Sequence, residues 1–233
     1  MKCADALFLC EKQMELPGRR RRKKRMKRIL CFGDSNTYGY KPDGSGRYDE
    51  NVRWTGRLQH MLGEEYQIME EGLCGRTTVF EDALRANRKG SQILPMLLET
   101  HNPLDLVIIM LGTNDCKRRY QASAKVIGKG MEQLVLQVKE KTERNTKLLL
   151  VSPIHMGKGV GEEGFDGEFD ENSEETVKQL KDEYEKIALD YHCNFLAASD
   201  SALPSPVDRE HLDERGHEKL AFAIYEKVRE IFP

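Results

Sequence analysis

One serine early in the chain stands where a nucleophile would be expected. Ser35 follows a short apolar run, residues 29–32, and belongs to a polar Gly-Asp-Ser-Asn stretch that favours a turn. A serine at the carboxyl end of a buried parallel strand lies at the edge where α/β sheets bind ligands. Its hydroxyl is a poor nucleophile at neutral pH, so it needs a base, a group that orients the base, and donors for an oxyanion.

A short motif near the C-terminus contains a base and an orienting group. Asp208 and His211 are three residues apart, a spacing that lets one loop turn a carboxylate and an imidazole into one pocket. The carboxylate would hold the imidazole tautomer and stabilise the imidazolium. Two other histidines are considered: His155, which follows a predicted strand and could line the pocket, and His217, expected in the first turn of the last helix.

Alternating strands and helices must position these residues. Apolar runs predict five strands, at about residues 28–33, 66–71, 105–111, 147–152 and 194–198. Apolar residues at helical spacing predict the helices between and after them, and Asp213 is a suitable cap for the last one. The pattern predicts one α/β domain, residues 26–233, built as a three-layer α/β/α sandwich with a five-stranded parallel sheet.

Two details of this pattern are testable. Pro95 is expected in the first turn of its helix, where a missing N–H costs little.

Residues 156–175 contain five glycines and eight Asp or Glu, and we expect them to form a solvated lid or subunit-contact loop. They lack the spacing of a calcium loop, and no metal site is predicted.

Composition separates the N-terminus from the rest. Residues 1–28 carry eleven Lys or Arg against three Asp or Glu, whereas the whole chain has a net charge of −2. The basic block 19–25 is consistent with a nucleic-acid-binding arm, but we interpret residues 1–25 as a disordered extension or the product of an upstream start codon. Nucleic-acid binding is therefore not expected.

The same composition indicates a soluble, cytoplasmic protein. No window has the ~18 apolar residues of a membrane span, and no credible signal peptide precedes the first strand. The six cysteines show no paired spacing, which is typical of reduced cytosolic thiols. Cys74 and Cys116 are interpreted as small packing residues.

Four blocks together resemble those of a known family. They are Gly33-Asp34-Ser35, a glycine within residues 70–78, Gly112-Thr113-Asn114-Asp115, and Asp208 to His211. In this order they resemble the SGNH (GDSL-type) hydrolases, and most of all their small bacterial arylesterase/acyltransferase branch, over residues 26–232. Asn36 departs from that pattern, because leucine is commoner there; we expect no effect on the chemistry.

The resemblance implies a flavodoxin-like fold and a serine esterase that works through an acyl-enzyme without a cofactor. It selects the catalytic residues Ser35, Asp208 and His211. The substrate would be a small-molecule ester with an acetyl or other short acyl group. Acyl transfer to another alcohol and assembly into a homo-oligomer are also consistent with this branch.

The resemblance further implies three oxyanion donors: the backbone N–H groups of Ser35 and Gly75 and the side-chain amide of Asn114. A glycine lets the backbone approach a substrate closely. Gly72 is the competing glycine, but Gly75 is preferred because it precedes Arg76 and Thr77 as the branch pattern requires.

Four further residues could have either a structural or a functional role. Arg76 could meet an anionic substrate or form a structural bridge. Asp34 and Asp115 are expected to brace their loops by hydrogen bonds. Trp54, the only tryptophan, is expected in the core rather than in the pocket wall.

Two functions of other classes remain open from the sequence. A catalytically idle α/β module would bind esters or sugars without turning them over. A nucleic-acid-associated protein would use the basic arm, and its affinity would depend strongly on salt.

Overall fold

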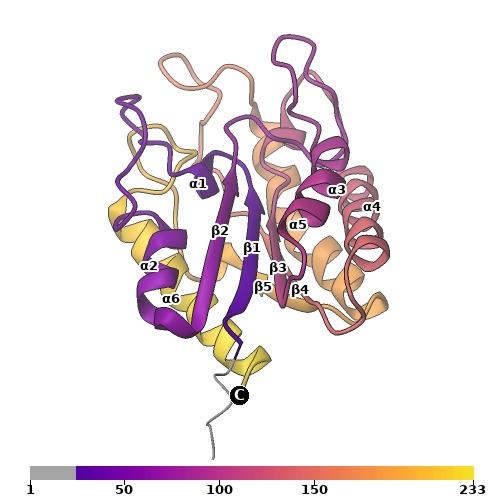
Figure 1. Cartoon of the computed structure of the whole chain (residues 1–233). Coiled ribbons are helices and arrows are strands. Elements are labelled where there is room, and N and C mark those ends of the chain that lie inside the picture. The colour runs from indigo at the N-terminus through magenta and orange to yellow at the C-terminus, as the bar shows by residue number, and fades with distance from the viewer. Residues whose placement is uncertain (1–24) are drawn as a thin grey trace, which may run out of the picture.

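The computed structural model describes residues 25–233, whose five strands form one parallel sheet. The strands are β1 (Lys27–Gly33), β2 (Tyr66–Gly72), β3 (Leu106–Met110), β4 (Lys147–Ser152) and β5 (Asn194–Ala197). They are ordered β2-β1-β3-β4-β5, and every neighbouring pair is parallel. All carboxyl ends therefore meet at one edge of the sheet, the upper edge in Figure 1.

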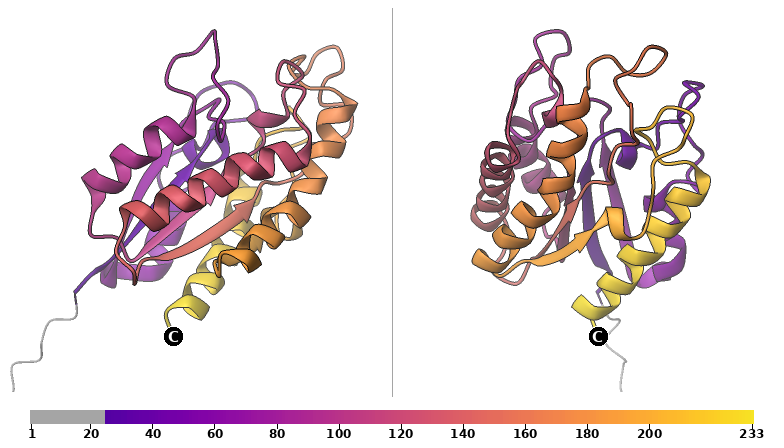
Figure 2. Two further views of the ribbon diagram at one scale, coloured as in Figure 1. Left: turned by 90° about the vertical axis from the view of Figure 1, so that its right-hand side faces the viewer. Right: turned by 180° about the vertical axis from the view of Figure 1, so that it is seen from behind.

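Helices cover both faces of the sheet, which confirms the predicted three layers. They are α1 (Ser35–Tyr38), α2 (Trp54–Leu62), α3 (Gly90–His101), α4 (Ala124–Lys141), α5 (Glu171–Asp190) and α6 (Glu214–Ile231). The long helices α3, α4 and α5 lie on one face, and α2 and α6 lie on the other (Figures 1 and 2). The connections from the helices back to the next strands are short. The long loops instead follow β2, β3, β4 and β5, at the carboxyl edge of the sheet.

The side-chain alternation of the strands divides the apolar interior into two cores. Leu30 and Val107 belong to the core under α3, α4 and α5, whereas Ile29 and Leu106 belong to the core under α2 and α6. β3 is buried on both faces and is apolar throughout, and the buried part of β1, from Ile29 to Phe32, is apolar as well. Trp54 is 1 % exposed in the second core, as predicted.

The expected position of Pro95 is wrong. Pro95 is the sixth residue of α3, so it lies in the second turn and cannot donate a hydrogen bond to the carbonyl of Ser91. The side chain of Gln137 in α4 replaces that bond, because its Nε2 donates to Ser91 O at 2.8 Å. A neighbouring helix thus makes the proline tolerable inside the helix.

The acidic loop is shorter than expected, because its last five residues begin α5. Asp170 caps that helix: its Oδ1 accepts from the backbone N–H of Ser173 at 2.9 Å, and Ser173 Oγ accepts from the backbone N–H of Asp170 at 3.1 Å. Such a capping box stabilises a helix start that the sequence pattern had assigned to the loop. Asp213 caps α6 as predicted, accepting from Gly216 N at 2.7 Å.

The basic extension predicted for residues 1–25 lies outside the described residues, apart from Arg25. Arg25 Nη2 donates to Asp105 Oδ1 at 2.7 Å, just before β3. In the described part of the chain, no helix is both long enough and apolar enough to cross a membrane.

Candidate active site

Ser35 is the first residue of α1, and only Asp34 separates it from the end of β1. Asp34 caps this short helix, because its Oδ1 accepts from the backbone N–H of Asn36 at 3.0 Å. A Cβ at Gly33 would lie 2.0 Å from Thr37 Oγ1, so the tight packing of the turn against the strand requires glycine there. The sequence therefore holds Ser35 on a rigid turn at the carboxyl edge of the sheet.

The loop between β5 and α6 brings Asp208 and His211 to that serine. His211 Nε2 lies 2.9 Å from Ser35 Oγ, and His211 Nδ1 lies 2.6 Å from Asp208 Oδ2. Asp208 Oδ1 accepts from the backbone N–H groups of Glu210 and His211, both at 3.0 Å, which fixes the carboxylate. With its proton on Nδ1, the imidazole presents Nε2 as an acceptor for the serine proton.

The electrostatic surroundings of His211 favour its protonated form. Burial alone would lower the pKa of the imidazole, but the carboxylates of Glu210 and Asp208 outweigh burial and raise that pKa above its ordinary value. Tyr40 packs against the imidazole with the ring centroids 4.8 Å apart. The site is thus suited to stabilise the imidazolium that forms when a serine is deprotonated.

Asn36 links the serine turn to the histidine loop, a contact that sequence reasoning missed. Its Oδ1 accepts from Leu212 N at 2.9 Å, and its Nδ2 donates to the carbonyl of Glu210 at 3.4 Å. The two bonds flank His211 in the chain. The one residue that departs from the family pattern therefore holds the expected base beside the expected nucleophile.

The three residues expected to supply oxyanion donors all line one cavity. Gly75 has φ +84°, a left-handed conformation that favours glycine, and lines the same cavity as Ser35 and Asn114. Neither the backbone N–H of Ser35 nor that of Gly75 donates to another described residue. The Asn114 amide donates one N–H to the carbonyl of Arg76 at 3.2 Å, which orients the group and leaves its second N–H for a ligand.

Two buried side chains hold the loop that carries Gly75. Arg76 Nη1 donates to the carbonyl of Gly33 at 2.8 Å and also to that of Glu71, and its guanidinium stacks on Phe32. Arg76 is therefore a structural bridge, the second of the two expected roles.

Asp115 also holds the loop that carries Gly75, through hydrogen bonds to Thr78. Its carboxylate accepts from the backbone N–H of Thr78 at 2.9 Å and from the Thr78 hydroxyl. Burial raises the pKa of Asp115 to about 7 and that of Asp34 to about 6. Both aspartates brace their loops, as expected.

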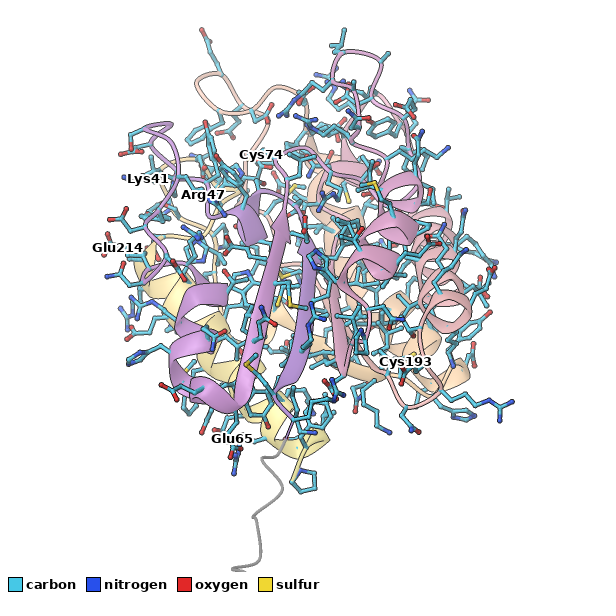
Figure 3. The ribbon with its side chains drawn as sticks, in the orientation of Figure 1. Lys41, Arg47, Glu65, Cys74, Cys193 and Glu214 are labelled. Atoms are coloured by element: carbon cyan, nitrogen blue, oxygen red, sulfur yellow. The ribbon has the colours of Figure 1, made fainter. Side chains whose placement is uncertain are left out.

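The site opens into a cavity of about 640 Å³ at the carboxyl edge of the sheet. Its polar wall includes Lys117, Glu210 and Arg85, and the acidic loop contributes Gly164, Phe165, Asp166 and Glu168 to the lining. The acidic loop thus lies against the site, as a lid would. Cys74 also lines this cavity, and Figure 3 shows it above the sheet, far from Cys193 near the opposite end.

The other two candidate histidines lie elsewhere. His155, which from its place in the sequence could have lined the pocket, is not among the residues that line the cavity. His217 is fully buried in the first turn of α6, and its Nδ1 accepts from Trp54 N at 3.3 Å. Burial lowers the pKa of His217 to about 3, which keeps this imidazole neutral.

Comparison with known proteins gives the class of the molecule. The sequence profile of the GDSL-like lipase/acylhydrolase family matches residues 31–219, so the chain belongs to this family. No curated protein sequence matches the chain at a significant level.

Solved structures of related proteins are similar over nearly the whole described chain. A carbohydrate acetylesterase from Sinorhizobium meliloti is 38% identical with a TM-score of 0.81, covering 88% of this chain and 100% of its own. The aryl esterase of M. smegmatis is 36% identical with a TM-score of 0.82, at the same coverage. Together with the family match, these relatives identify the chain as a carboxylic ester hydrolase with the SGNH hydrolase fold.

Proposed function

We propose that this ester hydrolase acts through an acyl-enzyme formed on Ser35. The supporting observation is the chain of short contacts from Ser35 Oγ through His211 to Asp208. Ser35 Oγ attacks the ester carbonyl carbon while His211 Nε2 takes the hydroxyl proton, and Asp208 stabilises the imidazolium. Collapse of the tetrahedral intermediate breaks the bond to the alcohol oxygen, which leaves with the proton from His211.

Hydrolysis of the acyl-enzyme repeats these steps with water. His211 takes a proton from water, the hydroxide attacks the acyl carbon, and Ser35 leaves with that proton while the carboxylic acid is released. In both steps the oxyanion is bound by the N–H groups of Ser35 and Gly75 and by the Asn114 amide. An alcohol that replaces water in the second step would make the enzyme an acyltransferase.

The preferred acyl group in this proposal is acetyl or another short chain. Two solved relatives are described as a carbohydrate acetylesterase and an aryl esterase, which supports small acyl esters as substrates. The polar wall of the cavity also suits a small polar ester better than a long acyl chain. No step of this mechanism requires a metal ion or organic cofactor.

Hydrolysis of p-nitrophenyl acetate tests the proposal. We expect Ser35→Ala and His211→Ala each to abolish turnover, while His60→Ala, which removes an exposed histidine outside the site, retains it. A wild-type rate no greater than that of Ser35→Ala would contradict the proposal and favour a binding module.

A cytoplasmic location is part of the proposal, because the four cysteines of the described residues are free thiols. Assembly into a homo-oligomer also remains a prediction, and sedimentation velocity of the full chain tests it.

A further inference from the structure

Glu210 is a buried carboxylate that the proposed mechanism does not use. Its side chain is 8% exposed, and it lines the cavity next to the site. The backbone N–H of Glu210 donates to Asp208, and its carbonyl accepts from Asn36. The carboxylate itself makes no hydrogen bond to any residue in the described range 25–233.

Among residues 25–233, the ion-pair partner of this carboxylate is His211, whose Nε2 lies 3.8 Å away, beyond hydrogen-bond distance, and is charged only when protonated. Lys117 faces the same part of the cavity, but its Nζ lies 2.5 Å from Glu168 Oε2 and is taken up by that pair. Burial raises the pKa of Glu210 to about 7. Buried polar groups are normally hydrogen-bonded, so a carboxylate that faces a cavity without a hydrogen bond indicates a donor that arrives with the ligand.

The position of Glu210 shows which part of an ester would meet it. Its Oε1 lies 3.8 Å from His211 Nε2, the atom that protonates the departing alcohol oxygen. Any oxygen that receives this proton lies about 3 Å from Nε2, and so within about 7 Å of the Glu210 oxygen. A hydrogen-bond donor on the next carbon atoms of the alcohol can span that separation.

We propose that Glu210 determines specificity by accepting a hydrogen bond from a donor on the alcohol part of the ester, close to the scissile oxygen. This inference rests on the proposed function. It places the alcohol part of the ester near Glu210 because His211 is taken as the group that protonates the departing alcohol. The donor is a neighbouring hydroxyl, as in a partly acylated polyol, or the N–H of an ammonium group.

The charge of the cavity restricts the alcohol further. Five carboxylates and two cationic side chains line it: Asp43, Asp166, Glu168, Asp208, Glu210, Arg85 and Lys117. The resulting negative potential favours neutral or cationic alcohols over anionic ones such as phosphate esters. Selection among alcohols therefore has two sources: a hydrogen-bond donor on the alcohol that matches Glu210, and repulsion of anionic alcohols by the acidic cavity.

Three acetate esters that differ only next to the ester oxygen test the proposal. Ethyl acetate has no donor, 2-hydroxyethyl acetate carries a hydroxyl, and 2-(dimethylamino)ethyl acetate carries an ammonium N–H when protonated. The measured quantity is kcat/KM for each donor-bearing ester divided by kcat/KM for ethyl acetate. Because each ratio is taken on one enzyme, changes in the basicity of His211 cancel.

We expect Glu210→Leu to reduce at least one of these ratios by about tenfold or more, as for loss of a hydrogen bond to a charged acceptor. The ester whose ratio falls identifies the donor as hydroxyl or ammonium. Glu210→Gln retains a neutral acceptor, so it should lose the ammonium preference while keeping part of a hydroxyl preference. It also provides a near-isosteric variant if Glu210→Leu does not fold.

The matched control is Glu163→Gln, the same change at an exposed carboxylate outside the cavity lining. Its ratios should equal those of the wild type. Ratios that stay the same in both Glu210 variants, with ethyl acetate still hydrolysed, would overturn the role of Glu210 and leave the proposed function intact. Failure of the wild type to hydrolyse any of the esters would overturn both.

Discussion

The carboxylate of Glu210 lies 3.8 Å from Nε2 of His211, the ring nitrogen that faces Ser35. The opposite nitrogen, Nδ1, lies 2.6 Å from Asp208. The imidazole is thus held between two carboxylates, one that orients it and one that also faces the cavity. Both carboxylates favour the imidazolium, so both affect the pH at which His211 can act as the proposed base.

The first prediction concerns the acid limb of the pH profile. His211 must be neutral to accept a proton, and its pKa is raised against burial by Glu210, Asp208 and Asp34. Activity is therefore lost as pH falls through this raised pKa, and the midpoint of kcat/KM should lie above pH ~6.5. Glu210→Gln removes one of the charges and should move the midpoint to lower pH.

The measurement is kcat/KM for p-nitrophenyl acetate from pH 5 to 9 in both proteins. Glu163→Gln serves as the control and should leave the midpoint in place. An identical acid limb in wild type and Glu210→Gln would show that the 3.8 Å contact has no electrostatic effect on the base.

The second prediction concerns the oxyanion donors. Asn114→Ala removes the side-chain amide, and its kcat should fall by ~10²–10³ with little change in KM, because the oxyanion forms only in the transition state. Steady-state kinetics on one ester give both constants. A rise in KM at unchanged kcat would assign Asn114 to ground-state binding instead.

The third prediction concerns Asn36. Asn36→Leu installs the residue that is commoner in the family, but it removes the bonds to Leu212 N and to the Glu210 carbonyl. Less precise placement of His211 should lower kcat by about 10- to 100-fold. Asn36→Asp keeps the Oδ1 acceptor and should recover part of the rate; equal rates for wild type and Asn36→Leu would refute this role.

Local sequence patterns carried most of the information on the fold and on Ser35, Asp208 and His211. Strand ends and loop starts are local features, and parallel strands bring their carboxyl ends together, so a serine after β1 and a histidine after β5 could be placed at one edge. Asn36 and Glu210 escaped prediction for two reasons. The role of Asn36 depends on bonds to residues 174 and 176 positions away, to which no motif points. Glu210 is adjacent to His211 in the chain, but its burial beside the cavity without a hydrogen bond follows from tertiary packing, which no local pattern encodes.

The wrong prediction for the position of Pro95 also has a tertiary contact as its cause. The expected first-turn position assumed that a helix must satisfy its own carbonyls, whereas Gln137 of α4 supplies the missing donor to Ser91 O. A helix boundary near a proline therefore depends on the neighbouring helix as well as on the sequence of the helix itself.

The fourth prediction concerns Pro95 and Gln137. Gln137→Ala leaves the Ser91 carbonyl without its donor and should lower the free energy of unfolding by about 1–3 kcal/mol. In a Pro95→Ala background the new backbone N–H can bond to Ser91 O, so the same change should cost less. Urea unfolding of the four proteins of this double-mutant cycle gives the coupling; strictly additive effects would contradict it.

The most direct test of the proposed mechanism is covalent labelling of Ser35. Wild-type protein is incubated with a fluorophosphonate probe, digested and analysed by mass spectrometry, alongside Ser35→Ala and His211→Ala. The account predicts one adduct on the peptide that contains Ser35, loss of esterase activity in step with labelling, and much slower labelling of His211→Ala. An unlabelled Ser35 in a protein that still hydrolyses esters, or an adduct on another residue that tracks the loss of activity, would contradict it.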